Sequence, residues 1–159
     1  MSEAIHIYTD GAASGNPGPG GYGIVMLYKG HRKELSGGFK LTTNNRMELL
    51  GVIVALEQLK SNTNPVVVFS DSKYVVDAFE KKWLAGWIKK DFKNVKNVDL
   101  WRRLLLLCKK HKVKFTWVKG HANNVENNRC DELAVEAYKQ PGLKTDTGYE
   151  SSQKNVFGI

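Results

Sequence analysis

The sequence predicts a single α/β domain built on a five-stranded mixed sheet, in which a three-strand antiparallel meander is joined to two parallel strands and helices flank the sheet. Three observations favour this fold class. Residues 5–13 show the alternation of a strand, in which Ile5, Ile7 and Thr9 would lie on one face and His6, Tyr8 and Asp10 on the other. Capping residues then precede a strongly apolar helix at 46–60. The continuous apolar run Val66–Phe69 follows and is typical of a buried parallel strand, which needs such a crossover helix.

Length and composition indicate one ordinary domain. The 159 residues are 42% hydrophobic and 10% aromatic, which is enough for one sizeable core. No apolar run approaches the roughly 18 residues that span a bilayer, and residues 1–4 lack the basic start and apolar core of a secretory signal. We therefore expect a soluble, cytoplasmic protein without membrane contact. Cys108 and Cys130 show no metal-binding or disulfide pattern and are expected to be reduced thiols.

The first three strands are expected to form the antiparallel meander. The first carries Asp10, a carboxylate that is costly to bury unless it is paired or binds a metal. A glycine- and proline-rich loop follows at 14–21, and Lys29-Gly30 supplies a turn. The strands are expected at residues 5–13, 22–28 and 31–41.

The helix at 46–60 is capped by the polar run 42–45 and has apolar residues around much of its circumference. It should therefore be largely buried. Glu48 lies in an early turn and is a second carboxylate that needs a partner. Asp71 follows the buried parallel strand, at the carboxyl end where open α/β sheets place their ligands. Asp71 could instead cap a helix at 73–79, or do both.

The formal charge of +8 is concentrated in one segment. Residues 81–119 hold 13 lysines and arginines against two aspartates, whereas the rest of the chain is slightly acidic. Within this segment, residues 81–96 interleave lysines with Trp83 and Trp87, and their charge density predicts an exposed protrusion. Clustered lysines with aromatic residues suit a nucleic-acid backbone, although a solvated helical face explains the charge equally well.

A helix at 99–110 and a fifth strand at 113–118 follow the protrusion. In the helix, Trp101 falls at the spacing of the core face, so it is expected to pack on the sheet rather than bind a ligand.

The end of the chain contributes two further candidate residues. The asparagine-rich stretch 119–128, which contains His121, predicts a loop that can move. A helix at 129–138 places Asp131 in its opening turn, where a carboxylate also complements the helix dipole. From residue 140 onward the chain shows no periodicity and predicts a loosely held tail. The expected division is one domain over 1–149 and a flexible tail over 150–159.

Four carboxylates can converge at one edge of this sheet: Asp10, Glu48, Asp71 and Asp131. Their repulsion is relieved most directly by divalent cations, and ligation by oxygen alone favours Mg²⁺ or Mn²⁺ over Zn²⁺. Two such ions about 4 Å apart can activate a water and stabilise the leaving oxygen of a phosphodiester. The pattern predicts hydrolysis of a nucleic-acid backbone.

Seven short motifs occur in a fixed order. They are Tyr-Thr-Asp-Gly at 8–11, Gly-Asn-Pro-Gly-Pro-Gly-Gly-Tyr-Gly at 15–23, Thr-Thr-Asn-Asn-Arg-Met-Glu-Leu at 42–49, Asp-Ser at 71–72, Lys-Asn-Val-Asp-Leu-Trp at 96–101, Trp-Val-Lys-Gly-His-Ala at 117–122 and Arg-Cys-Asp-Glu-Leu-Ala at 129–134. Each is weak evidence alone, whereas their joint order over about residues 5–149 is highly specific. In this order they closely resemble the type 1 ribonuclease H family, and its bacterial members most of all.

The resemblance implies a ribonuclease H-like fold and an endonuclease that hydrolyses the RNA strand of RNA/DNA hybrids, leaving 5′-phosphate and 3′-hydroxyl ends. It implies that Asp10 bridges two Mg²⁺ ions, with Mn²⁺ as a substitute. Glu48 and Asp71 would help to hold one ion, and Asp131 the other. His121 matches a mobile histidine that assists water activation or product departure. The residues that match substrate contacts are Asn16, Thr43, Asn44, Asn45, Trp83, Trp87, Lys89 and Lys90. We expect a monomer.

Two departures from the family pattern and two alternatives stand beside this interpretation. The protrusion is several residues shorter than in the best-known bacterial members, which bears on substrate affinity. The loop after His121 lacks a second histidine and a proline, which bears on loop mobility. One alternative is a catalytically inactive hybrid-binding module, which would leave the carboxylates without a purpose. The other is a different nucleotidyl-transfer nuclease of the same superfold, such as an integrase or a Holliday-junction nuclease, which is not expected to combine the Thr-Asn run with the protrusion.

Overall fold

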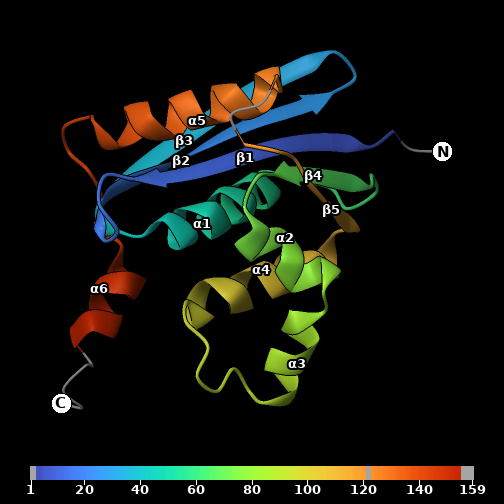
Figure 1. Cartoon of the computed structure of the whole chain (residues 1–159). Helices are drawn as coiled ribbons and strands as arrows, with labels where there is room; N and C mark the ends of the chain where they lie inside the picture. Colours follow the sequence, from blue (N-terminus) through green and yellow to red (C-terminus); the bar gives the residue numbers. More distant parts are fainter. Residues whose placement is uncertain (1–2, 121–122, 155–159) are drawn as a thin grey trace.

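The fold is a five-stranded sheet with helices on both faces (Figure 1). The computed structural model describes residues 3–120 and 123–154. The strand order is β3-β2-β1-β4-β5, with the first three strands antiparallel and both β4 and β5 parallel to β1. The strands are β1 (Ile5–Ala13), β2 (Gly18–Tyr28), β3 (His31–Thr42), β4 (Val66–Ser70) and β5 (Val113–Trp117). This confirms the predicted mixed sheet.

The helices divide unevenly between the two faces. They are α1 (Asn44–Glu57), α2 (Lys73–Glu80), α3 (Trp83–Lys89), α4 (Val98–Lys110), α5 (Val125–Tyr138) and α6 (Thr147–Lys154). In Figure 1, α5 covers one face over β1, β2 and β3, while α1 lies against the other face with α4 packed on it. Helix α3 lies away from the sheet.

Helix α1 is the central element of the core. Thr43 caps it, because its hydroxyl accepts a hydrogen bond from the backbone N–H of Arg46 at 3.2 Å. The helix is buried around most of its circumference, as predicted. Trp101 on α4 is fully buried in the same core, which confirms its predicted structural role.

Two boundaries predicted from the sequence were wrong. The glycine-rich stretch to residue 21 is not all loop, because β2 begins at Gly18 and pairs with β1 and β3. Its glycines let α5 pack on bare backbone: a Cβ added to Gly23 would lie 2.1 Å from the carbonyl oxygen of Cys130. Helix α5 begins at Val125, one turn before residue 129, because the side chain of Asn124 caps it by accepting from Asn127 N at 2.9 Å.

Apolar side chains within and just after α3 anchor the basic protrusion to the core. Leu84 in α3 and Phe92 after it are buried. The chain turns back through Asp91, Phe92 and Asn94, all with positive φ. Trp87 packs edge-on against Trp101, with ring centroids 5.2 Å apart.

The last part of the chain contains a helix that the sequence did not predict. Helix α6 spans Thr147–Lys154, so the proposed boundary at residue 149 falls inside it. Its apolar periodicity is too weak to signal a helix. Flexibility of residues 150–159 stays a prediction. Across 3–120 and 123–154, no helix is both long enough and apolar enough to cross a membrane.

Candidate active site

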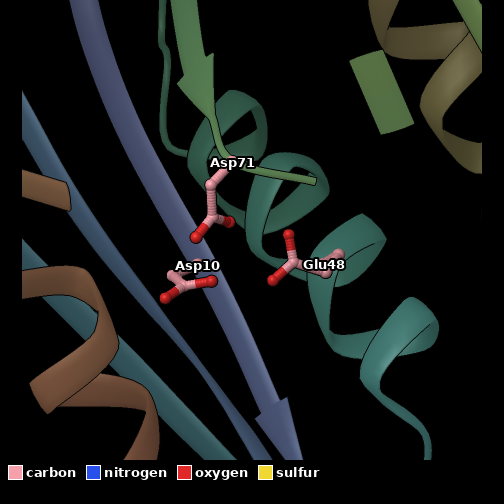
Figure 2. A group of neighbouring side chains, drawn as sticks. All are labelled: Asp10, Glu48 and Asp71. Carbon is pink, nitrogen blue, oxygen red and sulfur yellow. The ribbon is translucent and has the colours of Figure 1, made fainter. Parts of the chain in front are cut away.

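Three of the four predicted carboxylates meet at one end of the sheet. Asp10 lies on β1, Asp71 follows the carboxyl end of the neighbouring parallel strand β4, and Glu48 lies in an early turn of α1. Each offers one oxygen that lies within 4.8 Å of the other two. Figure 2 shows the three side chains turned toward one another from the three elements. The crossover from β1 through α1 to β4 therefore produces the cluster, as the parallel pairing predicted.

Asp10 and Glu48 form a buried pair at the centre of this cluster. Asp10 is 6% exposed and Glu48 is 7% exposed. The backbone N–H of Gly11 donates to both, at 2.9 Å to Asp10 Oδ1 and 2.5 Å to Glu48 Oε1. The other oxygen of Glu48, Oε2, is buried without a hydrogen-bond partner. A buried carboxylate oxygen without a partner is costly, so its position indicates a ligand.

Burial and mutual repulsion disfavour two charges on this pair. Burial raises the pKa of Asp10 far above its usual range, and the negative charge of Glu48 raises it further, with smaller contributions from Asp71 and Asp131. Burial also raises the pKa of Glu48, while the Gly11 N–H acts in the opposite direction. Without a cation, the pair therefore holds a proton at neutral pH.

The cluster opens into a cavity of about 450 Å³ that all four carboxylates line, together with Asn44 and Ser72. Asp131 lies on the wall of this cavity but does not belong to the group within 4.8 Å. Among the described residues that line the cavity, none is a lysine or arginine. Four carboxylates without a cationic side chain, and one orphaned oxygen, fit a divalent cation bound by oxygen ligands.

The turn that carries Asp71 is fixed by neighbouring elements. The hydroxyl of Ser72, and not the carboxylate of Asp71, caps α2 by accepting from Val75 N at 3.3 Å. This leaves the Asp71 side chain available to the cavity. Trp117, at the end of β5, donates from its indole Nε1 to the backbone carbonyl of Asp71 at 3.2 Å. Trp117 remains 44% exposed beside the site.

The predicted substrate contacts occupy two regions. Asn16, Thr43 and Asn45 line a second cavity, of about 960 Å³, whereas Asn44 lines the carboxylate cavity. The side chain of Asn16 accepts from Asn44 N at 3.1 Å, so the β1–β2 loop and the start of α1 form one surface.

The other predicted contacts lie on the protrusion. Trp83 is 43% exposed, and Lys89 and Lys90 are exposed. Trp87 is half-buried against the core. His121, the remaining predicted site residue, lies outside the described residues.

Three groups that shape the site were not identified from the sequence. The Gly11 N–H was hidden because a backbone donor carries no residue signal. The hydrogen bond from the Trp117 indole to the Asp71 carbonyl depends on β5 lying beside β4, and the spacing of residues within a strand does not reveal its neighbours. Arg46 binds Asp99 and Asp146, and only the presence of a cation at a core position of α1 hinted that it needed partners.

Comparisons with known proteins agree with this geometry. The family model described as RNase H matches residues 2–139. A ribonuclease H of Desulforamulus reducens is 63% identical over 147 residues, covering 89% of this chain and 92% of the relative. A ribonuclease H of Trichodesmium erythraeum is 56% identical over 151 residues, covering 92% and 96%.

Solved structures of similar proteins show the same fold. LC9-RNase H1, described as a type 1 RNase H with the type 2 active-site motif, has a TM-score of 0.77 at 30% identity and covers 99% of this chain and 83% of its own. LC11-RNase H1 in complex with RNA/DNA hybrid has a TM-score of 0.67 at 29% identity, covering 85% and 96%.

Proposed function

The chain belongs to the ribonuclease H family, and from this membership we propose that it hydrolyses the RNA strand of RNA/DNA hybrids with Mg²⁺ held by the four carboxylates that line one cavity. The observation that carries the proposal is the group formed by Asp10, Glu48 and Asp71, with its orphaned Glu48 oxygen. A binding module would not need buried carboxylates that repel one another. The proposed products carry 5′-phosphate and 3′-hydroxyl ends.

The carboxylates define where the chemistry takes place. Divalent ions bound there would supply Lewis acidity to activate water and to stabilise the leaving oxygen. Gly11 N–H fixes one oxygen of Asp10 and one of Glu48, which leaves Glu48 Oε2 free for a ligand. We propose that Asp131, on the cavity wall, would complete the ligand set. His121 is proposed to assist proton transfer or product departure.

The hybrid is proposed to lie across both cavities and the protrusion. Amide and hydroxyl groups of Asn16, Thr43, Asn44 and Asn45 suit sugar hydroxyls and phosphates of an A-like minor groove. Lys89 and Lys90, with Trp83 and Trp87, would hold the backbone farther away. Monomeric state, cytoplasmic location and Mn²⁺ as a substitute remain predictions.

The test is cleavage of matched RNA/DNA, RNA/RNA and DNA/DNA duplexes, with Mg²⁺ and with a chelator. Of the three duplexes, we expect only RNA/DNA to be cleaved, in its RNA strand and only when metal is present. The products should carry 5′-phosphate and 3′-hydroxyl ends, which a ligase can rejoin. Cleavage of DNA/DNA, or cleavage that survives chelation, would contradict the proposal. Binding of the hybrid without cleavage in Mg²⁺ or Mn²⁺ would favour the inactive binding module.

A further inference from the structure

We infer that the segment at 144–149, called here the C-terminal strap, positions the substrate-facing turn Thr43–Asn45 through the buried carboxylate of Asp146. Asp146 is thereby assigned as a positioning residue, not a catalytic one. The inference rests on the proposed function, because it concerns how the chain prepares its surface for the hybrid.

The strap is attached to the edge of the sheet. Lys144 forms a parallel bridge with Phe39 of β3, with hydrogen bonds from Lys40 N to Lys144 O at 2.9 Å and from Lys144 N to Gly38 O at 3.2 Å. Two residues later the chain buries Asp146, which is 7% exposed. The strap therefore holds a carboxylate at a fixed place beneath the end of β3.

Asp146 binds both sides of the turn that joins β3 to α1. Its Oδ2 accepts from Thr42 Oγ1 at 2.7 Å and from Arg46 Nε at 2.8 Å, and its Oδ1 accepts from Arg46 Nη2 at 3.0 Å. Thr42 is fully buried and Arg46 is 3% exposed. One carboxylate thus joins the residue before the turn to the residue after it, and charge-assisted bonds of this kind are strong and directional.

The turn held in this way presents the proposed substrate contacts. Thr43 and Asn45 line the 960 Å³ cavity, and Asn44 binds the side chain of Asn16. Helix α6 lines the same cavity through residues that include Tyr149 and Ser152. Asp146 also begins α6, since its Oδ1 accepts from Tyr149 N at 3.2 Å. The same side chain therefore sets two walls of the cavity.

Asp99 does not duplicate this function. It accepts from Arg46 Nη1 and Nη2 at 2.9 and 2.7 Å, but it comes from α4 and, in the part of the chain that the structure describes, it forms no hydrogen bond with Thr42. Asp99 can neutralise Arg46 when Asp146 is changed, which should preserve the fold. Only Asp146 links Arg46 to Thr42 among the described residues.

The experiment compares Asp146→Asn and Thr42→Val with wild type. The first keeps the side-chain shape and removes the charge, and the second keeps the β-branched shape and removes only the hydroxyl that Asp146 accepts from. Val66→Ala serves as the matched control, because it lowers stability from a buried position at the opposite end of the sheet from the carboxylates. Melting temperature, amide hydrogen exchange, Kd for the hybrid without metal, and KM and kcat with Mg²⁺ are measured for each.

We expect both Asp146→Asn and Thr42→Val to speed amide exchange at residues 43–46 and to raise Kd and KM for the hybrid by about tenfold. Their kcat should stay within about twofold of wild type, because the carboxylates keep their own contacts. Val66→Ala should lower the melting temperature but leave amide exchange at residues 43–46, Kd and KM at wild-type values.

If Asp146→Asn and Thr42→Val lower the melting temperature but leave exchange at residues 43–46 and KM at wild-type values, Asp146 only stabilises the fold and the inference is wrong. A fall in kcat at unchanged KM would also overturn it. The exchange measurement needs no substrate, so it decides whether Asp146 holds the turn even if wild type fails to bind hybrid. That last failure would count against the proposed function instead.

Discussion

The Asp10–Glu48 pair is the residue-level feature on which the chemistry depends. Two buried carboxylates that share one backbone donor cannot both ionise at low cost without a cation. The metal-free protein therefore keeps a proton on the pair, and a divalent ion must displace it. This coupling makes the site sensitive to both metal and pH.

Replacing Asp10 by Asn should abolish cleavage without unfolding the protein. We expect the Mg²⁺-dependent rate to fall by at least about 10³-fold, since losing a group that merely supports a metal ligand already costs about 10–100-fold. The melting temperature without metal should rise by about 2–8 °C, because the folded protein no longer has to take up a proton to keep two negative charges from being buried together. Hybrid cleavage and thermal unfolding measure the two effects.

Glu57→Gln is the control for Asp10→Asn, because it removes a carboxylate of α1 that binds Arg103 on the outer surface. It should cleave at the wild-type rate. Near-normal cleavage by purified Asp10→Asn would refute the assignment of Asp10.

The raised pKa values predict opposite effects of pH on metal-free stability and on metal affinity. The folded state holds a proton on the pair that the unfolded state loses near pH 4, so it binds more protons above that pH. The free energy of unfolding without metal should therefore fall as pH rises from about 4 toward neutrality. Apparent Mg²⁺ affinity should rise over the same direction, by up to about tenfold per pH unit.

Denaturant unfolding with chelator and Mg²⁺ titration by calorimetry, each at several pH values, test this dependence. The difference between wild type and Asp10→Asn isolates the pair from other titrating groups. A difference that does not change with pH would show that the pair carries no extra proton.

At the scale of elements, the site depends on how closely α1 approaches β1. A Cβ added to Gly11 would lie 2.5 Å from Glu48 N and 2.6 Å from the carbonyl carbon of Met47. Gly11→Ala should therefore push α1 away, lowering the free energy of unfolding by about 1–3 kcal/mol. A displacement near 1 Å can cost about 10²-fold in rate, so kcat should fall more than stability alone explains.

Gly86→Ala is the matched control for that substitution. It lies in α3, where nothing lies within 4 Å of an added Cβ, and alanine favours a helix over glycine. It should leave kcat unchanged and stability equal or higher. Equal rates for Gly11→Ala and wild type, in steady-state cleavage at saturating hybrid, would show that the close approach of α1 is not needed.

The elements were predictable where local chemistry decides them. Thr43 caps α1 and the apolar run of β4 forms the parallel strand, as their residues indicated. The prediction failed where tertiary packing decides: the glycines of β2 form a strand because α5 covers them, and α6 forms although its own periodicity is weak. Asp146 caps the start of α6, and its other partners lie about 100 residues away along the chain. The spacing of residues in the sequence cannot reveal contacts over that separation.

At the scale of the whole molecule, the carboxylate cluster was predictable because topology forces it. A strand, a crossover helix and a parallel strand bring Asp10, Glu48 and Asp71 to one end of the sheet whatever the loops do. Asp131 lies on the cavity wall, outside the closest group, and it stands in the second turn of α5 and not in the predicted opening turn, because α5 begins at Val125. The sequence therefore identified Asp131 as a candidate, whereas its distance from the other carboxylates depends on how α5 packs on the sheet.

The separation of charges across the molecule leads to the last prediction. The proposed cleavage takes place at the carboxylates, whereas exposed lysines of the protrusion would bind the nucleic-acid backbone elsewhere. Catalysis and substrate binding can therefore be weakened by separate substitutions. Replacing Lys89 and Lys90 together by Ala should raise KM for the hybrid and lower the slope of log Kd against log salt by up to about 1.8, since each phosphate contact contributes about 0.9. At saturating hybrid, kcat should not change.

The control is Lys109→Ala with Lys110→Ala, which removes the same charge from the end of α4 that leads to the start of β5, at the opposite end of the sheet from the carboxylates. Both pairs of lysines are exposed, so if only the net positive charge attracted the hybrid, the two variants would lose the same affinity for it. A smaller salt slope for the protrusion variant alone would place phosphate contacts there. Equal slopes for both variants would mean that net charge, and not the protrusion, holds the hybrid.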